Sequence, residues 1–556
     1  MLSILTFWIR VLPALTVGNQ DVLNFIAMDD PFYNLRLVEQ MLHNGFVYPW
    51  FDPMSQYPVG SPVNWGPMMT YITTAVAIVM GASTRPEIAF AALLAPPLLA
   101  AAMVPVMYFI GKTLSGWKTG LVGAVLVSIV SGQYFYRSLF GYLDHHIAEA
   151  LFSAIFALGY IYTLSYTRKN PVDLHKLETL KMPALLAGIT GVLYLLGLFT
   201  MPTMILFALI VTIFTVVQFL VDHWRGRGSD DLLLINAIVF AIASVGLAAF
   251  GIKASGLSVI QYSLGHVVAY VALIGITAVL YVLSTYLKGR NKAYFPLSLI
   301  AIAVIGTLAL VALFPSISST YIGGLYQFFG QPATALTVQE AMPWSLASAW
   351  ATFNYGLILM FVGIGALAYQ NWKENRPETI FAIVWSVIIL VSTIQHVRYE
   401  YYLAVNVAML SALGIGLFLD GGFQDSLRFI RRALTSNSHS EEKAAEPPSV
   451  HASKKHKKEQ KVATSSSDRP NYAKVGAFFG IAALAILFAT TSGYTNYTRA
   501  SLGGIQMNPD WKETLEWMQN GTPATGVDYN ALYDKVYDQS TFQYPQGSYG
   551  VMSWWD

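Results

Sequence analysis

The sequence contains no cysteine among its 556 residues, and only 12% of its residues are charged. The lack of cysteine excludes disulfides, thiolate metal sites and cysteine nucleophiles. The low charge excludes an ordinary soluble protein, because 55% of the residues are hydrophobic and the mean hydropathy is +0.49. This composition is typical of a polytopic membrane protein.

Apolar runs of about 20 residues, long enough to cross ~30 Å of hydrocarbon, recur along the chain. They predict thirteen spans, at residues 2–17, 86–111, 119–136, 146–166, 182–200, 203–222, 232–252, 265–287, 294–314, 349–371, 377–394, 402–420 and 473–492. The first run is short and contains Arg10, which indicates a tilted span or a clipped N-terminus. The Thr-rich stretch 66–83 opens with Gly-Pro, and we expect it to lie at the membrane interface or to re-enter.

The distribution of positive charge predicts the orientation. If the N-terminus is cytoplasmic, 24 of the 33 Lys and Arg residues lie in inner loops and nine lie outside. Four segments of the chain would then lie on the external face of the cell membrane, namely 18–85, 137–145, 315–348 and 493–556. We therefore expect a membrane domain at 1–434, a disordered cytoplasmic linker at 435–471, a last span at 472–492, and the start of an external C-terminal domain at 493–556.

Two of the external segments contain potential metal ligands. Asp29 and Asp30 precede Pro31 at the start of a helical pattern, and Asp144 and His146 stand at the head of a span. Taken alone, the first motif is better explained as a helix cap, and the second is explained equally well by a cap with interfacial histidines. Together they supply the oxygen and imidazole ligands that suit Mn²⁺ or Mg²⁺, with coordination positions left open for a substrate.

Three further charged residues belong to the same predicted face. Glu340 lies in an outer loop with few other charges, while Arg137 and Arg398 lie at the outer ends of spans. The alternatives are a solvated loop glutamate and arginines that anchor the helices at the interface. Because these residues and the potential metal ligands are predicted on the same face of the membrane, we favour a single site that contains all of them.

Four separated motifs identify a family that the chain resembles. They are Asp-Pro-aromatic-aromatic-x-x-Arg at 30–36, Gly-x-x-Asp-x-His at 141–146, Thr-x-x-Glu at 337–340, and the beginning of a Trp-Trp-Asp-Tyr-Gly signature at 554–556. With these motifs in this order, the chain resembles the catalytic subunit of oligosaccharyltransferase, of the archaeal single-subunit type. The resemblance implies an all-α polytopic membrane protein with the architecture of the C-type membrane glycosyltransferases.

The resemblance also implies roles for individual residues. Asp30, Asp144 and His146 would hold the divalent ion. Arg137 and Glu340 would act in catalysis, with Glu340 and Asp30 reaching the acceptor asparagine. The donor phosphate would contact Arg398. The hydroxyl residue of the acceptor sequence would be held by Trp554, Trp555 and Asp556.

The implied reaction is transfer of an oligosaccharide from a polyprenyl phosphate or diphosphate to Asn in an Asn-x-Ser/Thr sequence, with inversion at the anomeric carbon. The expected partners are the lipid-linked donor, an acceptor polypeptide and the membrane, with no nucleic acid. Because the chain stops inside its last motif, we expect the external domain to continue beyond Asp556. Two alternatives are another membrane glycosyltransferase that uses polyprenyl-phosphate sugars and a transporter, whose polar residues should lie at mid-membrane.

Overall fold

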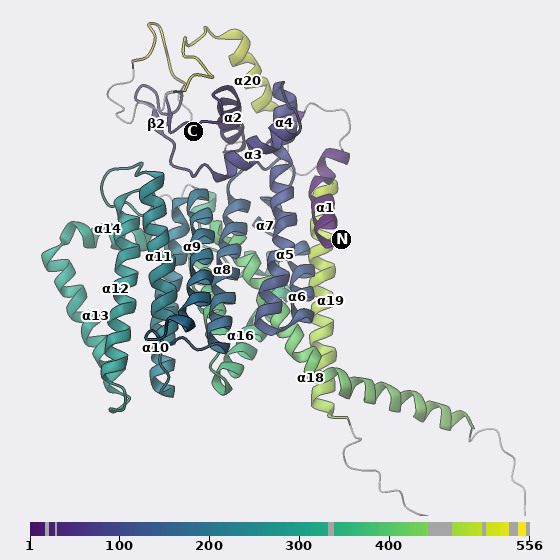
Figure 1. Cartoon of the computed structure of the whole chain (residues 1–556). Helices are drawn as coiled ribbons and strands as arrows, with labels where there is room; N and C mark the ends of the chain where they lie inside the picture. The colour runs from purple at the N-terminus through teal and green to yellow at the C-terminus, as the bar shows by residue number, and fades with distance from the viewer. Residues whose placement is uncertain are drawn as a thin grey trace, which may run out of the picture.

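The computed structural model describes residues 1–16, 22–27, 30–331, 338–442, 470–502, 507–532 and 543–551. These residues form a bundle of long helices with shorter helices and a small hairpin over one end (Figure 1). The hairpin pairs β1 (Phe51–Asp52) with β2 (Ser61–Pro62) in antiparallel register. The predicted all-α fold is confirmed.

The first half of the chain builds the end layer and one side of the bundle. Its helices are α1 (Leu2–Thr16), η1 (Val22–Phe25), α2 (Asp30–His43), α3 (Met68–Val79), α4 (Arg85–Leu93), α5 (Ala95–Ser115), α6 (Trp117–Ile129), α7 (Gln133–Tyr136), α8 (His146–Lys169), α9 (Leu177–Thr200), η2 (Pro202–Met204), α10 (Ile205–Arg225) and α11 (Asp230–Phe250).

The second half completes the bundle and returns to the same end layer. Its helices are α12 (Leu264–Tyr286), α13 (Tyr294–Leu313), α14 (Pro315–Phe329), η4 (Gln339–Ala341), α15 (Leu346–Phe353), α16 (Tyr355–Lys373), α17 (Pro377–Gln395), η5 (Val397–Tyr399), α18 (Glu400–Glu442), α19 (Tyr472–Ser501) and α20 (Pro509–Gly521). Helix α18 thus continues eight residues into the predicted linker, of which residues 443–469 lie outside the described part.

Among the described residues, ten helical stretches are long and apolar enough to cross a bilayer, and the bent pair α15–α16 makes an eleventh if it counts as one span. The predicted count of thirteen is not confirmed. Helices α1 and α6 form where spans were predicted, but they contain 15 and 13 residues. At 1.5 Å per residue, 13 residues extend only about 20 Å, which is less than the hydrocarbon thickness. Helix α3, with 12 residues, is also too short to span, as expected for an interfacial segment.

Two predicted spans are interrupted for identifiable reasons. The span predicted at 119–136 ends at Ile129, and Gly132 then adopts a φ of 87°. A Cβ at this glycine would lie 2.6 Å from Glu400 Oε1, so the close approach of α18 requires glycine. The span predicted at 349–371 is bent by 94° at Asn354, whose side chain accepts a hydrogen bond from Tyr355 N.

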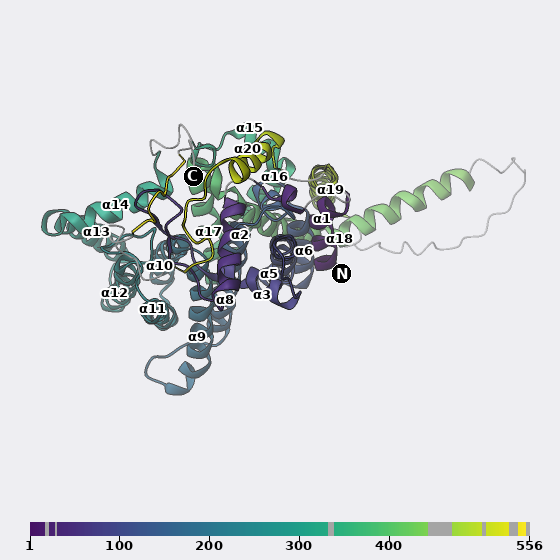
Figure 2. The same ribbon diagram turned by 90° about the horizontal axis from the view of Figure 1, so that it is seen from above.

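Helices α8 and α18 lie at the centre of the bundle, whereas α13 lies at its edge. The spanning part of α18 and most of α8 are buried, while Phe295 is the only buried side chain of α13. Seen from above, α13 and α14 occupy one edge and the end of α18 projects beyond the opposite edge (Figure 2). The central helices are therefore the ones best placed to position buried polar groups.

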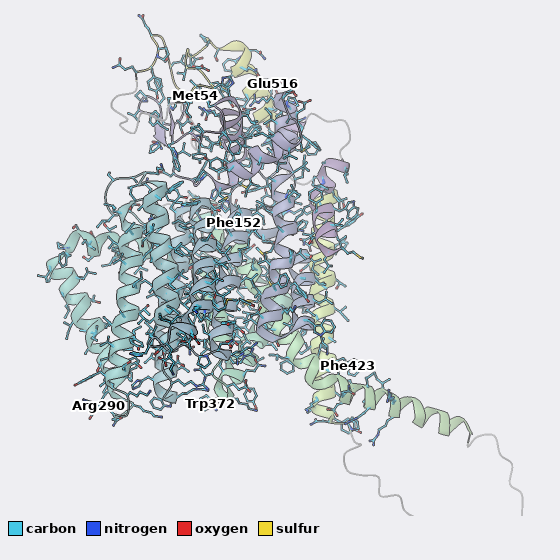
Figure 3. All side chains as sticks on the ribbon, in the orientation of Figure 1. Met54, Phe152, Arg290, Trp372, Phe423 and Glu516 are labelled. Carbon is cyan, nitrogen blue, oxygen red and sulfur yellow. The ribbon has the colours of Figure 1, made fainter. Side chains whose placement is uncertain are left out.

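The end layer is held together across large distances in sequence. Asn44 Nδ2 in the first outer segment donates to the carbonyl of Asn530, 2.7 Å away, and Tyr57 Oη donates to that of Ser548, 3.0 Å away. Met54 and Glu516 mark this end of the molecule in Figure 3, whereas Arg290 and Trp372 mark the other. The predicted external segments thus share one end of the bundle.

Candidate active site

Asp30 is brought to the bundle by the packing of α2 on the segment that precedes α8. Ala27 N donates to the carbonyl of Gly141 at 2.9 Å, and Asn34 Nδ2 donates to the carbonyls of Asp30 and Leu143 at 2.9 and 3.2 Å. The first acidic motif therefore lies beside the second, as predicted from the sequence.

The Asp-His-His triplet at the start of α8 is buried and compact. Asp144, His145 and His146 each offer a ligand atom, and these atoms lie within 4.8 Å of one another. His145 Nδ1 lies 2.6 Å from Asp144 Oδ1, and His146 Nδ1 faces the other carboxylate oxygen. The two rings stack with centroids 4.4 Å apart, and Trp65 and Tyr401 pack against them. No ligand role was predicted for His145, yet its ring belongs to this group.

These residues fit a divalent cation. None of the four buried ring nitrogens of His145 and His146 makes a well-aligned hydrogen bond within the described part of the chain. Asp144 Oδ2 is likewise buried without one. Buried imidazole nitrogens that face carboxylate oxygens at short range without aligned hydrogen bonds are the arrangement expected around an ion. The lack of cysteine and the oxygen and imidazole donors suit a hard or borderline metal.

Asp30 extends the negative charge of the site. It lies outside the 4.8 Å group, but burial and then the carboxylates of Asp144 and Glu340 raise the pKa of Asp30 to about 7. Repulsion between buried carboxylates is relieved by a cation. The predicted role of Asp30 as a ligand therefore remains a prediction with electrostatic support.

Arg137 connects the candidate metal-binding group (Asp144, His145 and His146) to Glu340, and Arg398 pairs with the other oxygen of Glu340. Arg137 lies 3.6 Å from Asp144 Oδ2 through Nη1 and 3.1 Å from Glu340 Oε2 through Nη2. The other oxygen of Glu340 lies 3.6 Å from Arg398 Nη1. Burial alone would raise the pKa of Glu340, but Arg398 and neighbouring positive charges lower it below its usual value. Four groups of alternating charge thus form a continuous chain, with Glu340 held as a carboxylate.

Glu149 is a buried carboxylate that the sequence interpretation missed. It accepts hydrogen bonds from Tyr401 at 2.9 Å and Tyr402 at 2.6 Å, and its Oε1 lies 3.1 Å from His145 Nε2. The sequence did contain a sign of its importance, because burying a glutamate in an apolar span is costly unless it has partners, and Glu149 follows His145 by four residues. The partners themselves come from α18, more than 250 residues away.

Glu400 anchors the loop that carries Glu340. Its carboxylate accepts hydrogen bonds from Gln133 N at 2.9 Å, Trp344 Nε1 at 2.8 Å and Thr352 Oγ1 at 3.3 Å. The same loop is tied to η5, which directly precedes α18, by the backbone hydrogen bond from Val397 N to the carbonyl of Met342 at 2.9 Å. Glu340 is therefore placed by contacts on its C-terminal side.

A cavity of about 200 Å³ opens beside this charge chain. Arg398 and Glu149 line it together with Tyr401, Tyr402 and the amide side chains of Asn64, Gln261 and Gln327. A single arginine, hydroxyl and amide donors, and apolar walls suit a ligand that combines an anionic group with hydroxyl groups and a hydrocarbon part.

The structure thus brings together Asp30, Arg137, Asp144, His146, Glu340 and Arg398 from four separate segments. Thr337, Trp554, Trp555 and Asp556 lie outside the described residues. Arg36, the last residue of the first motif, has a structural role instead. It forms a bidentate pair with Asp52 at 2.6 and 2.7 Å and fixes the hairpin to α2.

Comparison with known proteins decides the family. The family model described as "Oligosaccharyl transferase STT3, N-terminal" matches residues 18–419. The chain belongs to this family. A second model, the AglB core domain, matches residues 508–556 of this STT3 family member.

Curated relatives agree with this assignment. The STT3 chain is 26% identical to dolichyl-phosphooligosaccharide-protein glycotransferase 3 of Archaeoglobus fulgidus, over 95% of its own length and 58% of the relative's. It is 25% identical to dolichyl-monophosphooligosaccharide–protein glycotransferase AglB of Haloferax volcanii, over 96% and 56%. The chain therefore spans a little over half the length of these relatives.

Solved structures share the fold. The archaeal oligosaccharyltransferase AglB from A. fulgidus, in complex with an inhibitory peptide and a dolichol-phosphate, matches with a TM-score of 0.81 at 22% identity. The match covers 100% of this STT3 chain and 61% of that one. An A. fulgidus oligosaccharyltransferase in complex with Zn and sulfate matches with a TM-score of 0.71 at 21% identity, over 100% and 59%.

Proposed function

We propose that this chain transfers an oligosaccharide from a polyprenyl phosphate or diphosphate carrier to the side-chain amide of Asn in Asn-x-Ser/Thr sequences. The observation that carries the proposal is the convergence of Asp144, Arg137, Glu340 and Arg398 into one charge chain beside a cavity. The names of the relatives support it, since both act on a dolichol-linked oligosaccharide and a protein. A neighbouring structure tethered to a peptide with an NVT sequon supports the acceptor.

The acceptor half of the reaction needs two carboxylates. An amide nitrogen is a poor nucleophile because its lone pair is delocalised into the carbonyl. Asp30 and Glu340 would accept hydrogen bonds from the two N–H groups and turn the amide out of conjugation. The side chain of Glu340 is 35% exposed, so lone pairs that do not face the arginines can reach a bound peptide.

The donor half needs positive charge for the leaving phosphate. Arg398 is 31% exposed and lines the cavity, so it can pair with a phosphate that gains charge as the glycosidic bond breaks. Attack from the opposite side of the sugar would invert the anomeric carbon. Asp30, Asp144 and His146 would hold Mn²⁺ or Mg²⁺, which supplies further electrostatic stabilisation of this charge when bound.

The topology proposed from the charge distribution fits this chemistry. A cytoplasmic N-terminus would place the charge chain and the C-terminal segment on the external face of the cell membrane. Residues 1–434 and 472–492 would then form the catalytic membrane domain, with 435–471 as a cytoplasmic linker. Residues 493–556 would begin the external domain that holds the acceptor, in which Trp554, Trp555 and Asp556 would contact its Ser or Thr.

The test is glycosylation in vitro. The protein in detergent is incubated with a lipid-linked oligosaccharide and a fluorescent Asn-x-Thr peptide, with Mn²⁺ or with a chelator. We expect a slower-migrating glycopeptide that requires metal and is not formed with a Gln-x-Thr peptide. Sugar transfer to lipid or water in place of peptide would instead support another membrane glycosyltransferase, and would refute the proposal.

A further inference from the structure

A second cavity lies at the end of the bundle opposite the charge chain. Its volume is about 390 Å³, and it is lined by the end of α10 and the start of α13. Arg290, in the connection that leads into α13, and Trp372 mark this end of the molecule in Figure 3. Arg225 at the cavity donates hydrogen bonds to the carbonyls of Asn371 and Trp372, which places the cavity at the same level.

The polar part of the cavity lining is positively charged. Arg225 and Lys292 line it together with His223 and Trp224, and the lining contains no acidic residue. Lys292 Nζ lies 5.6 Å from the centroid of the Trp224 ring, and no carboxylate of the described residues lies within 4 Å of it. The cavity therefore presents positive charge and an aromatic ring at the end of the bundle opposite the charge chain.

The apolar part of the lining continues along α13, a helix whose surface is mostly exposed. Phe295 stacks on His223 with ring centroids 4.5 Å apart, and it is the only buried residue of α13. Beyond this contact, the Leu, Ile and Val side chains of α13 are mostly exposed around its whole circumference. In a bilayer such a surface is covered by hydrocarbon, and the cavity lies where the polar end of that hydrocarbon would be.

We propose that this cavity binds the anionic head group of a membrane phospholipid, with its phosphate at Lys292 and Arg225 and an acyl chain along α13. The combination of basic residues, an interfacial tryptophan and an adjoining apolar helix is complementary to both parts of such a lipid. On the charge-based topology, this lipid belongs to the cytoplasmic leaflet. The site is separate from the donor cavity, so the lipid is a structural ligand and not a substrate.

Native mass spectrometry of the full chain, released from detergent with phosphatidylglycerol or phosphatidylcholine, tests this site. The variant Lys292→Gln removes one exposed charge of the cavity, and Lys288→Gln removes one from the same connection outside the lining. We expect phosphatidylglycerol to be retained in preference to phosphatidylcholine, and Lys292→Gln to weaken its binding about fivefold, the worth of one lysine near anionic lipid.

The control variant distinguishes a defined lipid-binding site from a non-specific attraction of anionic lipid to basic residues. Lys288→Gln should keep the affinity of the unaltered protein. An equal loss in both variants, an absence of preference for phosphatidylglycerol, or full competition by inorganic phosphate would overturn the proposal. Glycosylation of the peptide is measured on the same samples, and its failure in the unaltered protein would refute the proposed function without bearing on this lipid site.

Discussion

Arg137 and Glu340, 203 residues apart in the chain, form a hydrogen-bonded ion pair of 3.1 Å. Because Arg137 also faces Asp144, this one side chain connects the candidate metal-binding group to the loop that carries Glu340, the carboxylate proposed to bind the acceptor. A nearly buried arginine between two carboxylates fixes both of them, and its removal leaves their charges uncompensated.

We predict that Arg137→Gln lowers kcat/KM for peptide glycosylation by about 100-fold, the range seen when a charge-stabilising group is removed from an active site. Arg499→Gln is the matched control, since Arg499 is exposed, stacks on Tyr136 nearby and belongs to no described ion pair. Similar activity of the two variants would contradict a role for the Arg137 pair.

Asp144→Asn keeps the shape of the side chain and removes its charge. Because Asp144 faces both imidazoles, we predict that this variant weakens Mn²⁺ binding by more than about 100-fold. Binding is measured by electron paramagnetic resonance of free Mn²⁺. Asp173→Asn, at an exposed position paired with Lys176, should bind Mn²⁺ like the unaltered protein. Unchanged Mn²⁺ binding by Asp144→Asn would show that Asp144 is not a metal ligand.

Tyr402→Phe deletes the 2.6 Å hydrogen bond to buried Glu149 and keeps the ring. A hydrogen bond to a buried charge contributes about 1.5–3 kcal/mol, so we predict a lower midpoint of thermal unfolding in detergent. Tyr399→Phe is the control, because the Tyr399 hydroxyl forms no hydrogen bond with the described residues. Equal midpoints for the two variants would show that Glu149 does not depend on Tyr402.

Glu400→Gln should loosen the loop at Glu340, because one of the two oxygens that accept from Gln133 and Trp344 becomes a donor. We predict faster hydrogen exchange over residues 338–353 and a higher KM for the peptide, with the exchange protection reduced by about 1–3 kcal/mol. Glu374→Gln, exposed at the far end of α16, should change neither. Exchange that is unaltered in Glu400→Gln would show that the loop is held by other contacts.

The parts of the site that could be predicted from the sequence are those written in local patterns. Asp30 before a proline at a helix start and the spaced pair Asp144 and His146 are motifs a few residues long, and their shared face followed from counting charges. The pairing of Arg137 with Glu340 could not be predicted, because it depends on how η4 lies against the end of α7. The tyrosines around Glu149 could not be predicted either, because they depend on how α8 and α18 pack side by side.

The fold shows the same division between local and long-range information. Apolar runs located the helices well, since hydropathy is a property of each segment. The breaks within the spans predicted at 119–136 and 349–371 could not be predicted, because the backbone conformations at Gly132 and Asn354 arise from contacts with α18 and α19. Composition alone carries no sign of those contacts.

The proposed reaction depends on a divalent cation held beside Glu340 and Arg398. The most direct measurement is anomalous diffraction at the manganese edge from crystals of the protein grown with Mn²⁺. We expect one strong peak about 2.0–2.4 Å from a carboxylate oxygen of Asp144 and a ring nitrogen of His146, with an oxygen of Asp30 completing the protein ligands. A fully occupied peak elsewhere, with Asp144 and His146 bonded only to each other, would contradict it.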